Sequence, residues 1–403
     1  MSHILMFTPL LPCPTGGGSA IRASAELELL AEYGRVIVVH CDYWGGDTLS
    51  VADASWCRQR AAAVLMVDPA RLQQVPDLVA DCLAAEGSGA SIDLIHVFRQ
   101  ILAPIGLKCR ERFSPRATFL DLDDDECARN RQFVPLYERA GYTVKVAAML
   151  AEEQRAQLIR SMFLPRYDRV FLSNEEDCAV VHAQQPTIRI ELLPNVVRPV
   201  PPLPGITADP HRMLYIGRLD YLPNEDAIHW FVGDMLPAIR AADPRFRLRV
   251  AGIGLPDTLR PSLVAEGVDF VGAVREVGPE FAAAGMLVVP LRAGSGTRIK
   301  ILEAFRHGTP VISTSIGAAG LNVTDGEHLL LADSAEAMTA ACLRLAGDTD
   351  LRARLASAAA AWVEKHHSLD AMRQVFRQAL GEPSAPEGDR QANSDSGGSG
   401  AGA

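Results

Sequence analysis

The sequence lacks an excess of positive charge, and this absence limits the classes of function that it can have. Its 403 residues include 39 Lys and Arg against 49 Asp and Glu, a formal net charge of −10 at pH 7. Proteins that bind nucleic acid generally carry a basic surface. The charge balance therefore argues against a general nucleic-acid binder.

Paired cysteines are also missing. The eight cysteines are scattered along the chain, and none forms a Cys-x-x-Cys pair. This spacing argues against a zinc site and a disulfide framework, and it indicates reduced core residues of a cytosolic protein.

Long apolar runs and a basic leader are absent as well. The N-terminus enters a strand without a basic region and soon meets prolines, unlike a signal peptide. We expect a cytoplasmic enzyme and leave a peripheral position at the inner face of the membrane open. Arg155, Arg160 and Arg166 alternate with apolar residues between 158 and 164, which suits a face for anionic lipid and a lipid-linked acceptor. A helix that packs its apolar side on its own domain is the simpler interpretation.

What the sequence does contain is two series of alternating strands and helices. The first series has predicted strands at 3–7, 35–40, 93–98, 118–122, 169–173 and 190–194, with helices at 19–33, 69–86 and 126–163. The second series has strands at 212–217, 247–252, 268–272, 286–290 and 311–314, with helices near 225–241 and from 298. Such alternation predicts two doubly wound α/β domains, which bind ligands outside the carboxyl ends of their strands.

A proline-rich stretch after residue 198 reads as the boundary between the two series. We expect a first domain at 1–198, a linker at 199–210 and a second domain at 211–365. The remaining residues form a helix at about 366–380 and a tail at 381–403, whose lack of apolar residues predicts disorder.

The stretch PLRAGSGTRIKILEAFRHGTPVIST (290–314) carries the strongest functional pattern. Gly294 and Gly296 permit a tight turn, Thr297 is placed to cap the helix that begins at Arg298, and the first turn of that helix attracts phosphate. Lys300 adds positive charge there. The carboxylate of Glu303 suits neutral hydroxyls such as those of a ribose. A ligand that has both phosphate groups and sugar hydroxyls is a nucleotide or a nucleotide-sugar. The alternative is that Lys300 and Glu303 form a solvated pair on the surface and bind no ligand.

Two other strand ends could contact the same ligand. Gly16, Gly17 and Gly18 precede a helix after the first strand, where the backbone can approach a phosphate closely. Arg218 follows the first strand of the second domain and suits a diphosphate. The alternative for the three glycines is a flexible loop without a ligand. The alternative for Arg218 is an ion pair with Asp220.

The first domain also has an acidic run, FLDLDDDECARNR. Asp121, Asp123, Asp124, Asp125 and Glu126 could bind a divalent cation, supply a base or begin the following helix. We favour the interpretation that these residues begin the following helix and provide polar groups near the acceptor, rather than bind a metal ion. His96 lies at a neighbouring strand end, facing the expected cleft, and Ser173 with Glu176 fits a capping box.

These residues resemble a known family. "YIGRLDYLPNEDAIHWF", "FVGAV", the 290–314 stretch and "IGAAGLNVTDGEHLLLAD" are similar to the retaining GT-B enzymes of the "glycosyl transferases group 1" family, in particular the bacterial sugar transferases of polysaccharide clusters. "TPLLPCPTGGGSAIR", "SNEEDCAVV" and "LLPNVV" extend the resemblance over residues 1 to 380. It implies two Rossmann-like domains with the donor held by the second, and a last helix that crosses back to the first.

The resemblance also implies roles for single residues. Arg218 would bind the donor diphosphate, Glu303 the donor ribose, and Gly16 to Gly18 the phosphates from the first domain. Three departures stand out. Ser295 replaces a glutamate that touches the donor sugar in many relatives. Asn224 replaces a lysine, which puts Lys300 forward as the phosphate ligand. The acceptor-side histidine has no match, which leaves Asp123, Asp124 and His96 as candidates.

The resemblance therefore implies a transferase of the EC 2.4 class that moves a hexosyl group from a nucleotide-sugar to a saccharide or lipid-linked acceptor. Arg218 and Lys300 would stabilise the departing diphosphate, with Ser295, Gly296 and Thr297 in the donor loop. We expect no metal and no further cofactor. A nucleotide-sugar epimerase and a non-enzymatic scaffold that binds a partner transferase are the alternatives.

Overall fold

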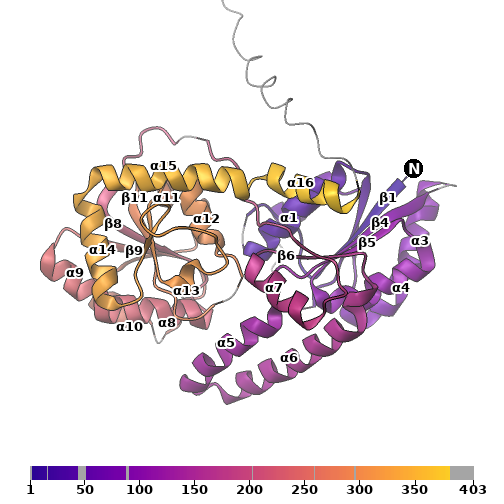
Figure 1. The fold of residues 1–403 in the computed structure, drawn as a ribbon, viewed down its shortest axis with the longest axis horizontal. Helices are drawn as coiled ribbons and strands as arrows, with labels where there is room; N and C mark the ends of the chain where they lie inside the picture. The colour runs from indigo at the N-terminus through magenta and orange to yellow at the C-terminus, as the bar shows by residue number, and fades with distance from the viewer. Residues whose placement is uncertain are drawn as a thin grey trace, which may run out of the picture.

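The computed structural model describes residues 2–15, 17–43, 51–87, 90–201, 203–257, 259–294 and 296–381. Two separate parallel sheets lie side by side, with the N-terminal part of the chain in indigo and magenta and the later part in orange (Figure 1). The prediction of two doubly wound α/β sheets is confirmed.

The first sheet has the strand order β3-β2-β1-β4-β5-β6-β7, and all its neighbours pair in parallel. Its strands are β1 (Ser2–Thr8), β2 (Arg35–His40), β3 (Ala63–Met66), β4 (Ser91–Phe98), β5 (Ala117–Asp121), β6 (Arg169–Leu172) and β7 (Ile190–Leu192). Its helices are α1 (Gly18–Ala31), α2 (Val51–Arg60), α3 (Val75–Glu86), α4 (Ala103–Phe113), α5 (Glu126–Arg139), α6 (Thr143–Phe163) and α7 (Glu175–Gln184), with short 3-10 turns η1 (Pro69–Gln74), η2 (Gln100–Leu102) and η3 (Leu164–Arg166).

The second sheet has the order β10-β9-β8-β11-β12-β13 and is also parallel. Its strands are β8 (Asp209–Ile216), β9 (Arg247–Ala251), β10 (Asp269–Gly272), β11 (Ala284–Val289), β12 (Val311–Ser313) and β13 (Leu330–Leu331). The helices are α8 (Leu222–Trp230), α9 (Leu236–Ala242), α10 (Arg260–Ala265), α11 (Gly278–Ala283), α12 (Ile299–Arg306), α13 (Ser315–Ala318), α14 (Ala335–Gly347), α15 (Thr349–His366) and α16 (Leu369–Ala379), with a π-helical turn η4 (Phe231–Met235) between α8 and α9.

Strand order places the functional loops. In each sheet the order reverses at one point, between β1 and β4 in the first and between β8 and β11 in the second. Loops that leave adjacent strands at such a point diverge to opposite faces and open a crevice at the carboxyl ends. The segments after β1, β4, β8 and β11 therefore flank the two crevices, and they include the predicted glycine loops and Arg218.

The last two helices connect the two halves (Figure 1). Helix α15 packs on the second sheet, where Trp362 meets Phe305 at 6.1 Å between ring centres. The chain then turns at His367, whose Nδ1 lies 2.8 Å from the carbonyl oxygen of Asn195. Helix α16 packs against the first sheet instead, with Phe376 fully buried beside Phe171 at 5.4 Å and Phe119 at 6.0 Å. The C-terminal helix thus completes the core of the first sheet.

Several local predictions were wrong. The predicted helix 126–163 is two helices, because Gly141 adopts a φ of 79° between them. Strand β3 and helix α2 were not predicted. Asn174 rather than Ser173 caps α7, since its Oδ1 accepts from the backbone N–H of Asp177 at 2.8 Å. The predicted disordered tail from residue 382 lies outside the described residues.

The face at 155–166 that could bind anionic lipid is only partly exposed, and part of it packs on its own domain as the simpler interpretation expected. Arg160 points inward and donates to Asp125 Oδ1 at 2.6 Å, and Ile159 and Leu164 are buried. Leu158 and Met162 remain exposed. Within the described part of the chain, no helix is both long and apolar enough to cross a membrane.

Replacing Phe376 by alanine should lower the free energy of unfolding by about 3–5 kcal/mol, the usual cost of removing a buried aromatic ring. Urea denaturation followed by tryptophan fluorescence measures the change. Gln374→Ala on the exposed side of the same helix is the matched control, with an expected change below about 0.5 kcal/mol. Equal, small effects of both variants would show that α16 is not part of the core.

Candidate functional site

Lys300 is the centre of the site at the second sheet. Its ammonium group is half-buried, donates to Asn224 Oδ1 at 3.1 Å and lies 4.6 Å from the ring centre of Tyr215. Its contacts within the described residues include no ion pair with a carboxylate. Burial, with the charge of Arg298 adding to it, lowers the pKa of Lys300 to about 7. The site therefore holds a cation whose charge is poorly compensated.

Asn224 holds this ammonium group in place. Its Oδ1 accepts from both Lys300 and the hydroxyl of Tyr215, the latter at 2.8 Å, while its Nδ2 donates to the carbonyl oxygen of Arg218 at 2.7 Å. Gly217 ends the strand beneath them, and a Cβ there would stand 3.0 Å from Lys300 Nζ. The structure thus places the ammonium group of Lys300 beside the side chain of Asn224.

Glu303 lies one turn further along α12. Its side chain is half-buried and makes no hydrogen bond or ion pair within the described residues. Burial raises the pKa of Glu303 to about 7, although the charge of Lys300 lowers it in part. A carboxyl group without a donor is available to the hydroxyl groups of a ligand.

Arg218 is exposed and extends from the end of β8. It forms an ion pair with Asp220, with Nη2 2.8 Å from Oδ2. The alternative interpretation from the sequence, an ion pair with Asp220, thus describes the contact in this structure. An exposed pair of this kind contributes little to stability, so Arg218 can change partner at small cost.

The first residues of α1 and α12 are in contact across the two sheets. A Cβ on Gly18 would stand 3.0 Å from Ile299 Cγ1. Neither helix has a side-chain N-cap, since Gly17 and Arg298 occupy the cap positions without such a bond. Two helix N-termini with uncapped N–H groups therefore meet where an anion would bind. Gly16 and Ser295, both predicted in this loop region, lie outside the described residues.

The loop before α12 contacts the first domain. The expected N-cap role of Thr297 is wrong, because its hydroxyl donates to the carbonyl oxygen of Ser173 at 3.2 Å and Arg298 takes the cap position. Gly296 adopts a φ of 68°, and a Cβ there would stand 3.1 Å from the Cβ of Asp124. Tertiary contacts between the domains therefore determine the conformation of this loop.

Arg99 organises the acidic run on the facing side. Its Nη2 donates to Asp123 Oδ2 at 2.6 Å and to Ser19 Oγ at 2.8 Å, and its Nη1 contacts Asp124. Arg99 and Asp123 have φ values of 76° and 65°, a region that residues other than glycine rarely adopt. Such strained residues are frequent at functional sites.

The pKa values of the two candidate carboxyl groups of this run shift in opposite directions. Burial alone would raise the pKa of Asp124, but Arg129 and Arg99 together hold it far below its usual range. Burial raises the pKa of Asp123 against the opposing charge of Arg99. Asp124 is thus committed to two arginines, whereas Asp123 is the better proton acceptor. Nothing in the sequence pattern had pointed to Ser19 or Arg129.

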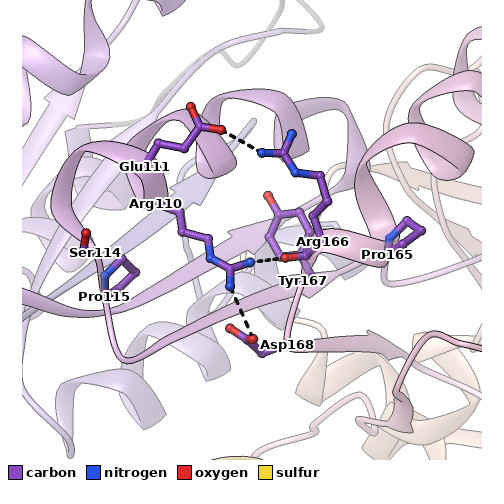
Figure 2. Close-up of a pocket in the computed structure, with 8 residues that line it drawn as sticks. All are labelled: Arg110, Glu111, Ser114, Pro115, Pro165, Arg166, Tyr167 and Asp168. Carbon is purple, nitrogen blue, oxygen red and sulfur yellow. Dashed lines mark hydrogen bonds and ion pairs between the residues drawn. The ribbon is translucent and has the colours of Figure 1, made fainter.

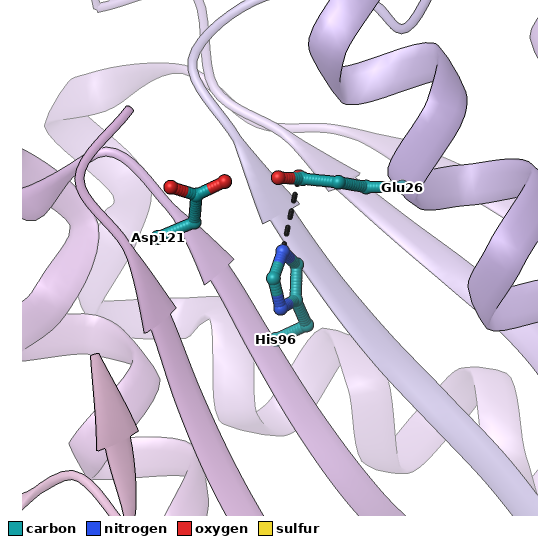
Figure 3. Close-up of side chains that lie close together, drawn as sticks. All are labelled: Glu26, His96 and Asp121. Carbon is teal, nitrogen blue, oxygen red and sulfur yellow. Dashed lines mark hydrogen bonds and ion pairs between the residues drawn. The ribbon is translucent and has the colours of Figure 1, made fainter. Parts of the chain in front are cut away.

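His96 does not reach the crevice, contrary to the prediction. The side chain is fully buried between the rings of Phe171 and Phe376, and its Nε2 lies 3.0 Å from Glu26 Oε2 (Figure 3). Burial lowers its pKa to about 4, so the ring is neutral at pH 7. The cause is α16, which covers this end of β4, and we therefore withdraw His96 as an acceptor-activating group.

Glu26, His96 and Asp121 form the one cluster in the described residues with ligand atoms close enough for a metal ion (Figure 3). Arg22 occupies its edge, with Nε 2.7 Å from Asp121 Oδ2 and 3.5 Å from Glu26 Oε1. Burial and the neighbouring Asp121 raise the pKa of Glu26 well above its usual value. A guanidinium group and a carboxyl group of raised pKa fit a structural network better than a cation site.

A shallow pocket of about 640 Å³ lies between the C-terminal end of α4 and the segment before β6 (Figure 2). Arg166 and Glu111 pair there at 2.7 Å, and Arg110 lies 3.7 Å from Asp168. These residues precede β5 and β6 or end α4, so they lie at the edge of the sheet opposite the strand carboxyl ends. The pocket is therefore remote from both crevices.

Comparison with known proteins finds a family match for the segment that forms the second sheet. Residues 210–348 match the family model "Glycosyl transferases group 1". This segment is therefore similar to the group 1 glycosyltransferases. The match contains Arg218, Asn224, Lys300 and Glu303, so the site described above lies within the matched segment.

Two curated proteins are similar over part of the chain. The "Uncharacterized 44.6 kDa protein in cps region" of Klebsiella pneumoniae is 25% identical over 130 residues, which are 30% of this chain and 33% of that protein. A phosphatidyl-myo-inositol mannosyltransferase of Mycobacterium leprae is 27% identical over 183 residues, 44% of this chain and 48% of the relative. The chain thus spans less than half the length of either relative.

Solved structures extend the likeness to the whole fold. Anabaena Alr3699/HepE, solved in complex with UDP and glucose, superposes with a TM-score of 0.68 at 16% sequence identity, covering 94% of this chain and 99% of that one. The predicted GT-B architecture of two facing α/β sheets is confirmed by this match.

Gly296→Ala should loosen the contact between the matched segment and the first sheet. The left-handed conformation costs a non-glycine residue about 1–2 kcal/mol, and the added Cβ also presses on Asp124. We expect backbone amides of residues 173–177 to exchange hydrogen roughly tenfold faster, which mass spectrometry measures.

Gly308→Ala is the matched control, because Gly308 has a φ of 69° and no atom within 4 Å of its added Cβ. It should carry the same backbone cost without the faster exchange at 173–177. The same exchange pattern in both variants would refute a specific role of the contact with Asp124.

Proposed function

We propose that the protein is a glycosyltransferase that moves a sugar from a nucleotide-sugar to an acceptor hydroxyl with retention at the anomeric carbon. The observation that carries the proposal is the poorly compensated ammonium group of Lys300 beside the carboxyl group of Glu303, which has no hydrogen-bond donor, on one face of α12. A diphosphate supplies the missing negative charge, and ribose hydroxyls supply the missing donors.

The negative charge that develops on the leaving diphosphate would be stabilised by three groups. Lys300 faces it from α12, the N–H groups at the start of α12 and α1 lie beside it, and Arg218 can leave Asp220 to reach it. Fixed positive groups aimed at developing charge are an effective source of catalysis. Because these groups are cationic or dipolar, the proposed transfer does not require a divalent cation.

Asp123 is the proposed group on the acceptor side. It lies at the carboxyl end of β5 with 13% of its side chain exposed, and its raised pKa favours proton transfer more than the pKa of Asp124 does. Closure of the two domains about the proposed linker at 199–210 would exclude water and limit donor hydrolysis.

The comparisons support a bacterial cell-surface glycoconjugate as the product. They also make UDP the first nucleotide to test as part of the donor. The similar proteins include a protein of a cps region, a mannosyltransferase and a protein whose structure contains UDP and glucose. We propose a hexosyl group as the sugar and a saccharide or lipid-linked acceptor on this basis.

Calorimetric titration with UDP and GDP, in magnesium and again after chelation, tests the donor site. We expect binding that survives chelation and weakens roughly 10- to 100-fold in Glu303→Ala, the range for losing hydrogen bonds to a charged group. Arg218→Ala should weaken binding by a smaller factor, about three- to tenfold, because Arg218 is exposed.

Asp234→Ala, which removes an exposed carboxylate of the same domain, is the control and should bind as tightly as the parent protein. Failure of the parent protein to bind any nucleotide would remove the donor site and favour a scaffold role. Nucleotide binding with a change in the sugar but no transfer to any acceptor would indicate an epimerase instead.

A further inference from the structure

A cavity of about 250 Å³ opens in the first domain among the segment after β2, η2, α5 and α6. Its polar lining includes Tyr43, Gln100, Asn130, Glu152 and Arg155. The volume corresponds to roughly eight water molecules, which suits one sugar ring rather than a long oligosaccharide.

The cavity lies beside the proposed reaction site. Arg129 lines the cavity, and its Nη1 donates to Asp124 Oδ2 at 2.9 Å. Asp124 in turn contacts Gly296 of the donor loop, as described above. One side chain therefore separates the cavity from the crevice where the acceptor hydroxyl would react.

The charges around the cavity balance. Two arginines, 129 and 155, and two glutamates, 126 and 152, line it. Arg129 already pairs with Asp124, while Arg155 and Glu152 form no ion pair within the described residues. A free phosphate or other polyanion would meet as many carboxylates as guanidinium groups. A neutral polyhydroxyl compound, in contrast, can use both the donors and the acceptors.

Gln100 adds a specific need for a donor. Its side chain is 2% exposed, and its Nε2 donates to Glu126 Oε2 at 2.7 Å, which fixes the orientation of the amide. Its Oε1 is buried and accepts no hydrogen bond within the described residues. A buried acceptor without a donor is unfavourable by about 1–3 kcal/mol, and a ligand hydroxyl would satisfy it only if the Gln100 side chain turned toward the cavity.

Apolar surface completes the lining. Ala156 and Ile159 contribute buried aliphatic groups from α6, and Tyr43 contributes an aromatic ring. Polar residues outnumber these apolar ones in the lining, which suits a ligand that carries several hydroxyl groups. The C–H face of a pyranose can pack on these apolar groups while its hydroxyls reach the polar rim.

We infer that this cavity binds a neutral pyranose unit of the acceptor, placed away from the hydroxyl that receives the transferred sugar. The inference rests on the proposed glycosyltransferase function and adds the acceptor class and its subsite. Glu152 and Arg155 on α6 and Asn130 on α5 hold the hydroxyls.

Saturation-transfer NMR on the UDP-loaded protein tests the inference. The probes are the methyl glycosides of glucose, galactose, mannose and N-acetylglucosamine, with methyl glucuronide and inorganic phosphate as anionic competitors. We expect at least one neutral glycoside to bind and to lose affinity about fivefold or more in Glu152→Ala and Arg155→Ala. Gln154→Ala, an exposed residue of the same helix outside the cavity, is the matched control and should bind as the parent does.

An octyl glycoside in place of the methyl form distinguishes the source of the sugar. Tighter binding of the octyl form indicates a lipid-linked acceptor, and equal binding indicates a soluble saccharide; both results support the pyranose site.

Absence of binding by every neutral glycoside while UDP still binds would overturn the inference and leave the proposed function intact. Preferential binding of phosphate or the glucuronide, or unchanged binding in both cavity variants, would also overturn it. Failure of UDP itself to bind would instead refute the proposed function on which the inference rests.

Discussion

The incomplete countercharge of Lys300, to which Glu303 contributes only in part, is the constraint on which the proposed donor site depends. An ammonium group taken partly out of water loses hydration that only an anion can restore fully. Asn224 and Tyr215 offer a carbonyl oxygen and a ring face, which position the group without neutralising it. The pKa of Lys300 falls to about 7 for this reason. A bound diphosphate would compensate for the lost hydration of the ammonium group. The free energy that this compensation releases would contribute to the affinity for the ligand.

The first sheet has the opposite electrostatic character. Arg22 and Arg99 are buried among carboxylates that face them at hydrogen-bond distance, and the pKa of each guanidinium is raised although burial opposes this. Such networks of buried ion pairs and hydrogen bonds make a local structure rigid. Arg99 and Asp123 are held in strained backbone conformations by these bonds. We interpret the first domain as a rigid support for the acceptor side and the second as the side that responds to the donor.

Most of the fold was predictable because hydrophobic periodicity and glycine turns act locally. The helix after Thr297 was predicted within one residue of its observed start at Ile299, since its apolar spacing and Gly308 mark both ends. Strand β3 was missed because its four residues are only half-buried or exposed and carry little pattern.

The errors at the site arose from contacts between distant segments. Thr297 bonds Ser173 instead of its own helix, and α16, more than 270 residues away from His96, covers that histidine. The position of Lys300 beside Asn224 could be anticipated only through the family resemblance, because 76 residues separate them. The cavity that includes Gln100 and Glu152 had no local signal, since helices and turns from four segments form it.

The most direct test of this account is proton uptake on UDP binding, measured by calorimetry at pH 8 in two buffers that differ in ionisation enthalpy. Free Lys300, with a pKa of about 7, is mostly neutral at pH 8, whereas a bound diphosphate raises the pKa of Lys300 and stabilises the charged form. Binding therefore takes up about one proton per site, and affinity falls as the pH rises above 7. Glu303 is already mostly ionised at pH 8 and contributes little. The account predicts uptake in the parent protein and in Glu303→Gln, where binding is detectable, and its loss in Lys300→Gln. UDP binding by the parent protein without proton uptake would contradict it.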